Sequence, residues 1–522
     1  MVSTTAGRAL AAANINDNTG GDITPADVRA VFTAAFDVVE KADSPVASVL
    51  DHDATAGNGA TNAVTAITAA AATGRCRLPP GVYRISSNIT VSVPIHFYPG
   101  ASLSIDSGIT VTLTDRMTAP FAQIFSGAGT VTGLSRDVRP EWWGALRNGT
   151  TDDSAAINKA AVCVGTTGGG TVILSAGNYA VQNSIVIAHD NVAFRGAGQR
   201  TTRLLNPTTT VSTFQVNTGR VHWIISDLSI LHTLTTVSGS VKTTAGAGIN
   251  APEGSYGLIE RVDIHGACFG IVLGNSVGTH VAKFEIDQFA AAGILINGNA
   301  NDMFIRDGII AGGFNGVADT TNIGIHLRNK AEAIFVSNLE IIQCDLALKT
   351  DVDVAGIAPA FSFFESCFFD SCTSGVLLYR CLSVRFTDCW FSNRPNHGCV
   401  VRECTDTSFV NCSFINSHQH GCVVEASAKH TKFNGCTFSD NGQAAAGTWD
   451  GLAINAGTTD FSVTGCSMMN TARFGNTQRN GVRVGAGASD RYIIADNLVT
   501  GNTSTGVVDS GSGTNKRVAN NY

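Results

Sequence analysis

The sequence predicts an all-β chain folded as a solenoid of parallel strands, that is, a parallel β-helix. The clearest sign is a repeat, because FTDCWFSNRPNHGCVV (386–401) is followed at once by FVNCSFINSHQHGCVV (409–424). Inside each copy every second residue is apolar, as in strands that bury one face. The 56 Gly among 522 residues supply many short turns. Short strands that recur at a period of roughly 20 to 30 residues are typical of coils stacked on one another.

A ladder of cysteines sets the period. Cys367, Cys389, Cys412, Cys436 and Cys466 follow one another at spacings of 22, 23, 24 and 30 residues. We expect Asn338 and Asp263 to take the same position in earlier coils and Asn497 in a later one. A Gly followed by alternating apolar residues comes shortly after each Cys, at Gly375, Gly398, Gly421, Gly451 and Gly481. The same pattern occurs after Asn497 at Gly506, and more loosely upstream at Gly270, Gly293 and Gly324.

These cysteines are expected to be structural. Cys behaves as a small buried hydrophobe, and side chains stacked one rung apart point the same way, which suits a disulfide poorly. The 14 Cys lack CxxC pairs and zinc-type Cys/His spacing, so we predict free thiols in a protein made in a reducing cytoplasm.

The N-terminal half contains two related strand starts, LPPGVYRISSNITV (78–91) and LSAGNYAVQNSIVI (174–187). Each follows an Ala-rich segment that predicts a short helix, 62–74 and 151–165, and Thr151 or Asp152 can cap the second. Such helices would cover the apolar end of a solenoid. The expected domains are an attachment segment at 1–50, a small β domain or neck at 51–139, the β-helix at 140–510 and a tail at 511–522.

Composition excludes several functions. The net charge is −7 without a basic tract, so nucleic acid is not an expected partner. No apolar run reaches the roughly 18 residues of a membrane span, and the N-terminus is a poor secretory signal. GTTGGG (165–170) lacks the Lys of a phosphate loop, and NDNTGGD (16–22) lacks the final Glu of a calcium loop. We therefore expect no cofactor and no metal.

The segment PEWWGALRNGTTDDSAAINKAA…GGGTVILSAGNYAV…NVAFRGAG (140–198) resembles the opening of the pectate-lyase-like right-handed β-helix of phage tailspikes and related polysaccharide-degrading proteins. In that family a Trp-Gly-Ala stretch, a Gly-x-Thr-Asp-Asp helix start and a Leu-Pro-x-Gly-x-Tyr strand occur in this order. Leu174-Ser-Ala-Gly-Asn-Tyr departs by replacing the Pro. Residues 98–133 look like the neck of such spikes, and residues 21–39 are similar to N-terminal segments of phage fibres and spikes.

The resemblance implies a homotrimeric tailspike that joins other virion tail proteins through its N-terminus. It would bind and depolymerise a bacterial surface polysaccharide, which could be capsule, O-antigen or exopolysaccharide. Glycoside hydrolysis by paired carboxylates is the first hypothesis. A lyase that acts by β-elimination on a uronate glycan is the second, and a non-catalytic adhesin or structural fibre or baseplate protein is the third. The fold itself does not decide between them.

Among the candidate catalytic residues, Glu425 comes from the outward positions after each coil Gly, and Asp440 and Asp450 come from the loops just before it. Glu425 is central, with Asp450 or Asp440 as its partner, because a glycosidase needs two carboxylates roughly 5 to 9.5 Å apart. Arg402 one rung away and His420 in the preceding turn would orient the sugar. An ordinary surface pair between Glu425 and Arg402 is the alternative.

The candidate substrate-binding residues are Arg402, His420, His418, Tyr379, Arg328 and Trp449. Arg328 and Arg402, with Lys349, form an expected cationic stripe that could hold an anionic sugar. On a uronate, the same stripe with Tyr379 or an Arg as the base would suit β-elimination. Trp449, Tyr379 and Trp390 offer flat faces on which sugar rings stack.

Overall fold

The computed structural model describes residues 48–208, 210–232, 245–313, 321–352, 356–392, 395–471 and 473–522. All but the last three residues of the predicted attachment segment, 1–50, lie outside this part of the chain. Two compact units are present, Met1–Ser135 with Glu141–Gly144, and Arg136–Pro140 with Ala145–Tyr522. The boundary coincides with the short 3₁₀ helix η1 (Pro140–Trp143), where the strand rhythm of the sequence breaks.

From residue 48 onward, the first unit is itself a short parallel solenoid that includes the helices α3 (Val49–His52) and α4 (Val64–Ala71). Its strands form three small sheets: β1 (Asn58–Asn62), β3 (Gly81–Ile85), β6 (Ala101–Ile105) and β9 (Phe125–Gly127); β4 (Ile89–Val91), β7 (Thr110–Leu113) and β10 (Thr130–Thr132); and β2 (Cys76–Leu78), β5 (Ile95–Phe97) and β8 (Met117–Thr118). Tyr83, Phe97 and Phe125 are among the largest side chains buried in its core.

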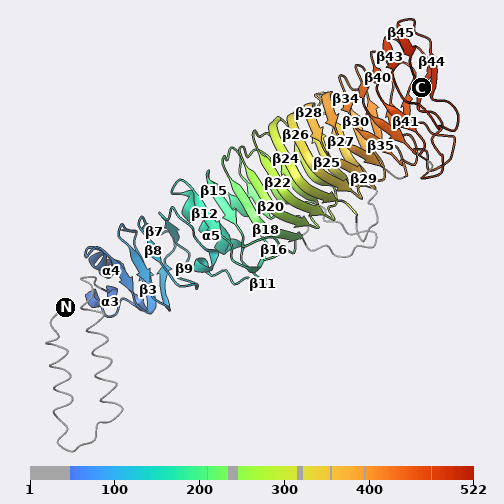
Figure 1. The fold of residues 1–522 in the computed structure, drawn as a ribbon. Helices are drawn as coiled ribbons and strands as arrows, with labels where there is room; N and C mark the ends of the chain where they lie inside the picture. The colour runs from blue at the N-terminus through green and yellow to red at the C-terminus, as the bar shows by residue number, and fades with distance from the viewer. Residues whose placement is uncertain are drawn as a thin grey trace, which may run out of the picture. The chain divides into compact units, whose positions relative to one another are not determined.

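The second unit is the predicted β-helix, and Figure 1 shows its coils stacked rung on rung. A 22-stranded parallel sheet, called the large sheet below, contains β11 (Asn148–Asp152), β12 (Gly170–Ile173), β13 (Gly177–Ala180), β15 (Val192–Arg195), β16 (Thr202–Asn206), β18 (Ile224–His232), β20 (Leu258–His265), β22 (His280–Asp287), β24 (Ala300–Ala311), β26 (Ala331–Ile342), β28 (Ala360–Glu365), β29 (Phe368–Asp370), β31 (Leu382–Thr387), β32 (Trp390–Ser392), β34 (Ser408–Val410), β35 (Ser413–Ile415), β37 (Lys432–Asn434), β38 (Thr437–Ser439), β40 (Ser462–Thr464), β41 (Ser467–Met469), β43 (Tyr492–Ala495) and β45 (Lys516–Ala519).

A 13-stranded parallel sheet, called the second sheet below, closes each coil. It contains β14 (Ile185–Ile187), β17 (Phe214–Val216), β19 (Ala247–Ala251), β21 (Phe269–Leu273), β23 (Ala292–Asn297), β25 (Ile323–Arg328), β27 (Leu346–Asp351), β30 (Gly375–Tyr379), β33 (Cys399–Arg402), β36 (Cys422–Val424), β39 (Leu452–Ile454), β42 (Val482–Gly487) and β44 (Val507–Gly511). Pairing continues to β45, so the predicted tail, 511–522, contributes a strand to the last coil.

From β18 onward, each coil turns within the large sheet at a residue in the left-handed conformation. These residues form a corner ladder with φ between 52° and 65°: Asp227, Arg261, Lys283, Asp307, Asn338, Ser366, Asp388, Asn411, Gly435, Gly465, Asp496 and Asn520. Asp, Asn and Gly tolerate this conformation better than other residues, and they occupy nine of the twelve positions.

The cysteine ladder follows directly from this corner. Cys389, Cys412 and Cys436 each come one residue after it and lie on successive rungs, as predicted. Their thiols donate to the carbonyl two residues earlier, at 3.3, 3.4 and 3.6 Å, across the turn. All 14 cysteines lie within the described ranges, are buried and form no disulfide.

The upstream extension of the ladder was wrong by one residue. Asn338 is itself a corner residue, and Leu339 takes the Cys position there. Val262, which pairs with Leu228 just after the corner, takes the position that we predicted for Asp263. Asn497 does occupy the predicted place, since its side-chain oxygen accepts the Cys466 N–H at 2.8 Å.

Phe residues stack inside the same coils. Phe386, Phe409 and Phe433 lie 5.1 and 4.9 Å apart, nearly parallel, in one column. A second column contains Phe391, Phe414 and Phe438 at 4.5 and 4.7 Å. The spacing equals that of neighbouring strands, about 4.8 Å, so each repeated Phe packs on its copy in the next coil.

Helix α5 (Ser154–Gly165) contacts β12, β14 and β15, near the start of the second unit. Asp152 accepts the Ser154 N–H at 3.0 Å and its hydroxyl at 2.5 Å, so Asp152 does serve the first turn. That α4 and α5 act as caps of the solenoid stays a prediction. Among the described residues, no helix has the length and hydropathy of a membrane span.

The corner ladder yields a stability prediction. Asp388→Val should lower the free energy of unfolding by about 1–2 kcal/mol, because a β-branched residue is strained at φ 54°. Asp388→Gly should have little effect. Thr387→Val, one residue earlier in β31, is the matched control. Chemical denaturation measures all three, and equal losses for Asp388→Val and Thr387→Val would contradict the role of the corner.

Candidate functional site

Four predicted residues share a stripe on the outer face of the second sheet. The register aligns, at one end of its strands, Asn297, Arg328, Asp351, Tyr379, Arg402 and Glu425. The structure thus brings together Arg328, Tyr379, Arg402 and Glu425 on neighbouring rungs. We call this set the outer stripe.

Lys349 does not belong to the outer stripe, although the sequence placed it there. Lys349 pairs with His326, which lies two residues before Arg328 on the same outer face. Asp351 pairs with Arg328 and takes the stripe position. The error arose because Ala347 stands where neighbouring coils have the Gly from which positions were counted. The stripe therefore contains an additional carboxylate that the sequence analysis missed.

Asp351 lies at the centre of a charged cluster. Lys349 Nζ is 2.8 Å from its Oδ2, and His326 Nε2 is 3.5 Å away. Burial raises the pKa of Asp351, but Lys349 and His326 together outweigh it, so the net pKa is lowered. Burial, with Lys349 and Arg328 nearby, lowers the pKa of His326 to about 4, so its imidazole is neutral at neutral pH.

Three buried polar atoms in this cluster have no hydrogen-bond partner: His326 Nε2, Arg328 Nε and Asn329 Oδ1. Asn329 is held by its amide, which donates to Asn297 Oδ1 at 2.7 Å. An unsatisfied buried polar group costs about 1–3 kcal/mol, so three in one place need a reason. The three atoms are an amide acceptor, a guanidinium donor and a neutral ring nitrogen that lies 3.5 Å from the Asp351 carboxylate.

Glu425 and Arg402 form the ion pair that the sequence allowed as the alternative. The guanidinium donates twice, at 2.5 and 2.8 Å, and the Glu425 side chain is 28% exposed. Hydrogen bonding to Glu425 raises the pKa of Arg402. Tyr379, one rung from Arg402, also lies against the Arg380 guanidinium at 5.2 Å.

His420 and Trp449 belong to a separate cluster in the turns before the second sheet. His420 stacks on His397 with centroids 5.3 Å apart and meets Trp449 edge-on at 5.0 Å. Burial lowers the pKa of both imidazoles to about 4. His420 Nδ1 accepts the backbone N–H of Asp450 at 2.8 Å, which fixes the ring.

Asp450 is fully buried beneath this cluster. It accepts hydrogen bonds from Arg479, Asn480 and Arg483 at 2.6 to 2.8 Å. Burial raises the pKa of Asp450, but the two guanidiniums outweigh it, so its pKa is lowered and it stays ionised. Asp450 pairs with His420 in register, five residues before Glu425, which corresponds to about 16 Å along the strand. The structure therefore does not bring Glu425 and Asp450 together as a carboxylate pair.

Asp440 lies on another face, at the end of β38 in the large sheet. Its carboxylate accepts the backbone N–H and the hydroxyl of Thr471 at 2.7 and 2.6 Å, and the residue is 2% exposed. It borders a pocket of about 640 Å³ that Trp390 also lines. His418 is half-buried in the turn between β35 and β36. The Thr471 contacts hold Asp440 on the large sheet, away from the outer stripe on the second sheet.

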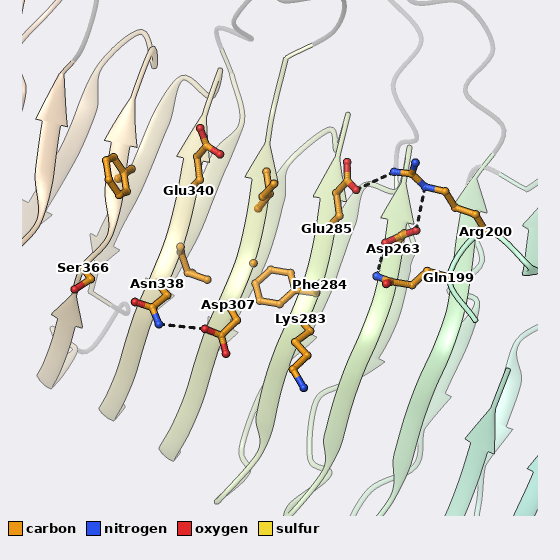
Figure 2. Close-up of a pocket in the computed structure, with 14 residues that line it drawn as sticks. Gln199, Arg200, Asp263, Lys283, Phe284, Glu285, Asp307, Asn338, Glu340 and Ser366 are labelled. Atoms are coloured by element: carbon orange, nitrogen blue, oxygen red, sulfur yellow. Dashed lines mark hydrogen bonds and ion pairs between the residues drawn. The ribbon is translucent and has the colours of Figure 1, made fainter. Parts of the chain in front are cut away.

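The sequence analysis missed a pocket of about 960 Å³ on the large sheet (Figure 2). Arg200 reaches Asp263 at 3.7 Å and Glu285 at 3.1 Å, and the Gln199 amide donates to Asp263 at 2.6 Å. Corner-ladder residues form part of its lining. Outward positions counted from the Gly of the second sheet do not include the residues that line this pocket, so none of them was predicted as a site residue.

Metal ligation has no evident place in the described part of the chain, where no group of three or more His, Cys, Asp or Glu could hold an ion. The chemistry available at the outer stripe and at the adjoining His326 and Lys349 is that of a neutral imidazole, a phenol, two kinds of cation and ion-paired carboxylates.

Family comparisons agree with this architecture. The chain matches the family described as right handed beta helix region over residues 315–468 and 360–522. It matches the family described as rhamnogalacturonase A/epimerase, pectate lyase-like, over residues 141–377. A comparison with curated protein sequences finds no match.

Solved structures share the fold at low identity. The AlgE6 A-module of the Azotobacter vinelandii mannuronan C-5 epimerase is 16% identical, with a TM-score of 0.56 over 74% of this chain and 98% of that one. Tailspike protein 3 of bacteriophage CBA120 (15% identity, TM-score 0.53) and the pre-mature gene product 12 of bacteriophage phi29 (14%, 0.53) each match 73% of this chain, and 61% and 57% of their own lengths. Its stacked parallel coils and both family matches show that the chain has the pectate-lyase-like right-handed parallel β-helix fold.

Proposed function

We propose that the protein binds a uronate-containing polysaccharide along the outer stripe and cleaves it by β-elimination. The observation that carries this proposal is the cluster of His326, Arg328, Lys349 and Asp351 beside Tyr379, with unpartnered buried atoms on His326 and Arg328. It is the set of groups that proton abstraction next to a carboxylate requires.

Each group has a defined task in this proposal. Arg328 and Lys349 neutralise the uronate carboxylate, which acidifies the proton on the adjacent ring carbon. His326 Nε2 accepts that proton, the bond from the next ring carbon to the glycosidic oxygen breaks, and a carbon–carbon double bond forms. Tyr379 gives its phenolic proton to the departing oxygen. The released chain gains a hydroxyl, and the new end is an unsaturated uronate.

Hydrolysis by paired carboxylates has less support on this face. Asp351 and Glu425 are three rungs apart, about 14 Å at the spacing of neighbouring strands. Glycosidase carboxylates lie roughly 5 to 9.5 Å apart, and here each is also held by a cation. The name of one structural neighbour, a mannuronan C-5 epimerase, places uronate chemistry on the same fold.

We further propose that the protein acts as a phage tailspike on a bacterial surface polysaccharide. Two phage proteins, one of them named a tailspike, share the fold. Segments 98–133 and 21–39 resemble the neck and the N-terminal part of such spikes. In this proposal the protein is a homotrimer, and residues 1–50 attach it to other tail proteins. A purely adhesive spike is the alternative.

The first test removes the proposed base and acid. His326→Gln and Tyr379→Phe should each lower kcat by roughly 10²- to 10⁴-fold, as expected for loss of a positioned proton carrier. The measurement is release of ultraviolet-absorbing unsaturated ends from polymannuronate, polygalacturonate and glucuronate-containing capsule. Tyr256→Phe, at a tyrosine that is 52% exposed on another coil, is the matched control. Parental rates for both site variants would refute the site, and reducing ends without unsaturation would indicate hydrolysis.

The second test is pH dependence. Because burial lowers the pKa of His326 from 6.5 to about 4, the neutral base persists through the neutral range, and kcat/KM should fall only as pH drops through about 4. The same shift has a stability cost: protonation is easier in the unfolded chain, so stability is lost as pH falls from 6.5 towards 4. His326→Gln should remove part of that loss in thermal melts. A kcat/KM limb at a pH near 6.5 would contradict a buried base.

The third test concerns assembly. Light scattering at micromolar concentration should give three times the chain mass, since side-by-side solenoids cover one another's flanks. A chain truncated to start at Asp51 should still form trimers but should not join virions. A monomeric full-length protein would refute the trimer, and a truncated chain that still attached would refute the role of residues 1–50.

A further inference from the structure

In each coil, one residue of the strand segment that follows the corner ladder points outward from the large sheet. These residues form a column that joins two pockets. The register aligns the column, called the track below, as Asp263, Glu285, Ile309, Glu340, Phe368, Trp390, Ser413 and Thr437. The 960 Å³ pocket reaches Phe368, and the 640 Å³ pocket includes Trp390 on the next rung. Phe368 and Trp390 stack at 6.4 Å, so the two pockets meet at an aromatic pair.

The smaller pocket contains an unpaired donor and an unpaired acceptor. Trp390 Nε1 and Asn416 Oδ1 are buried and have no hydrogen-bond partner. Phe474 and Arg473, whose guanidinium lies 5.2 Å from that ring, also line this pocket. A hydroxyl both donates and accepts, so one polyol could satisfy both orphan atoms. The Asp440 carboxylate accepts the backbone N–H and the hydroxyl of Thr471, so it positions the Thr471 segment of the pocket lining.

Apolar side chains are exposed beside these polar groups. Phe368 is 52% exposed and Ile309 is 40% exposed, and both line the larger pocket. Sugar rings combine a flat apolar face with hydroxyls at the edge, and sites that bind them pair aromatic side chains with a few polar groups. Figure 2 shows the polar side chains of the larger pocket on successive strands.

The charge of the larger pocket differs from that of the outer stripe. Four carboxylates, on Asp263, Glu285, Asp307 and Glu340, face two cations, Arg200 and Lys283, a balance of −2. Such a surface repels a polyuronate and favours neutral sugars, whose hydroxyls donate to carboxylates. The rungs repeat every 4.8 Å or so, close to the length of one pyranose, so a linear chain along the axis would meet one track residue per sugar.

We propose that the track is a second carbohydrate-binding site, distinct from the outer stripe, that takes a neutral segment of a linear polysaccharide. Sugar rings stack on Phe368 and Trp390. Hydroxyls bond to Trp390 Nε1 and Asn416 Oδ1 at one end and to the carboxylates of the larger pocket at the other. The proposal does not depend on cleavage at the outer stripe.

The experiment measures binding of cellohexaose, laminarihexaose and maltohexaose by saturation-transfer NMR, with hexamannuronate as the charged comparison. Phe368→Ala and Trp390→Ala should each weaken binding of a neutral hexasaccharide roughly tenfold, as loss of an aromatic stacking partner predicts. Phe361→Ala is the matched control, because Phe361 is 48% exposed on the adjacent strand β28 but does not line either pocket. Thermal melts establish that each variant is folded, and Phe368→Ala, at an exposed ring, keeps the test valid if Trp390→Ala unfolds.

Tyr379→Phe separates this proposal from the proposed function, because it should leave hexasaccharide binding unchanged. Three outcomes would overturn the second site: no hexasaccharide binding that depends on Phe368, tighter binding of hexamannuronate than of the neutral sugars at the track, or a change of oligomeric state in Phe368→Ala. The last outcome would mean that a second copy of the chain covers the track.

Discussion

The parallel stacking of one coil on the next is the constraint on which the rest of this molecule depends. Each strand pairs in register with its copy one rung away, so a side chain has the same neighbours above and below through many coils. From β18 onward the corner ladder keeps that register, since each of these coils turns within the large sheet at one left-handed residue. Columns of Phe and Cys then fill the interior, and columns of polar residues form the outer surfaces.

This regularity explains what the sequence could predict. Alternating apolar residues and the Cys spacing were enough for the fold, for Cys389, Cys412 and Cys436 on successive rungs and for Arg402 beside Glu425. Counting failed wherever a coil departs from the consensus. In the coil of β27, Ala347 stands in place of the Gly from which outward positions are counted. Lys349 was therefore predicted at the stripe position that Asp351 occupies. Because side chains alternate along a strand, small errors of register exchange one functional group for another.

The orientation of side chains in the turns could not be predicted from the sequence, for a different reason. Their lengths differ from coil to coil, so spacing does not fix where a turn residue points. In the sequence, the turn before Asp450 does not stand out among the other turns. In the structure, the Asp450 carboxylate is fully buried and accepts hydrogen bonds from two guanidiniums and one side-chain amide. The partners come from later coils, 29 to 33 residues away in sequence. Only tertiary structure could separate this buried anion from an accessible carboxylate.

The buried anion also explains how an irregular turn keeps a defined shape. Removing one partner of a buried ion pair commonly costs about 3–5 kcal/mol, because the remaining charge is left without compensation. Arg479 and Arg483 therefore hold Asp450 in a single position, and its backbone N–H in turn orients His420 against Trp449. A ring that is fixed, uncharged and beside an indole forms a rigid wall next to the second sheet. In this protein the regular ladders supply repeated surfaces, and buried charges of this kind shape the turns that border them.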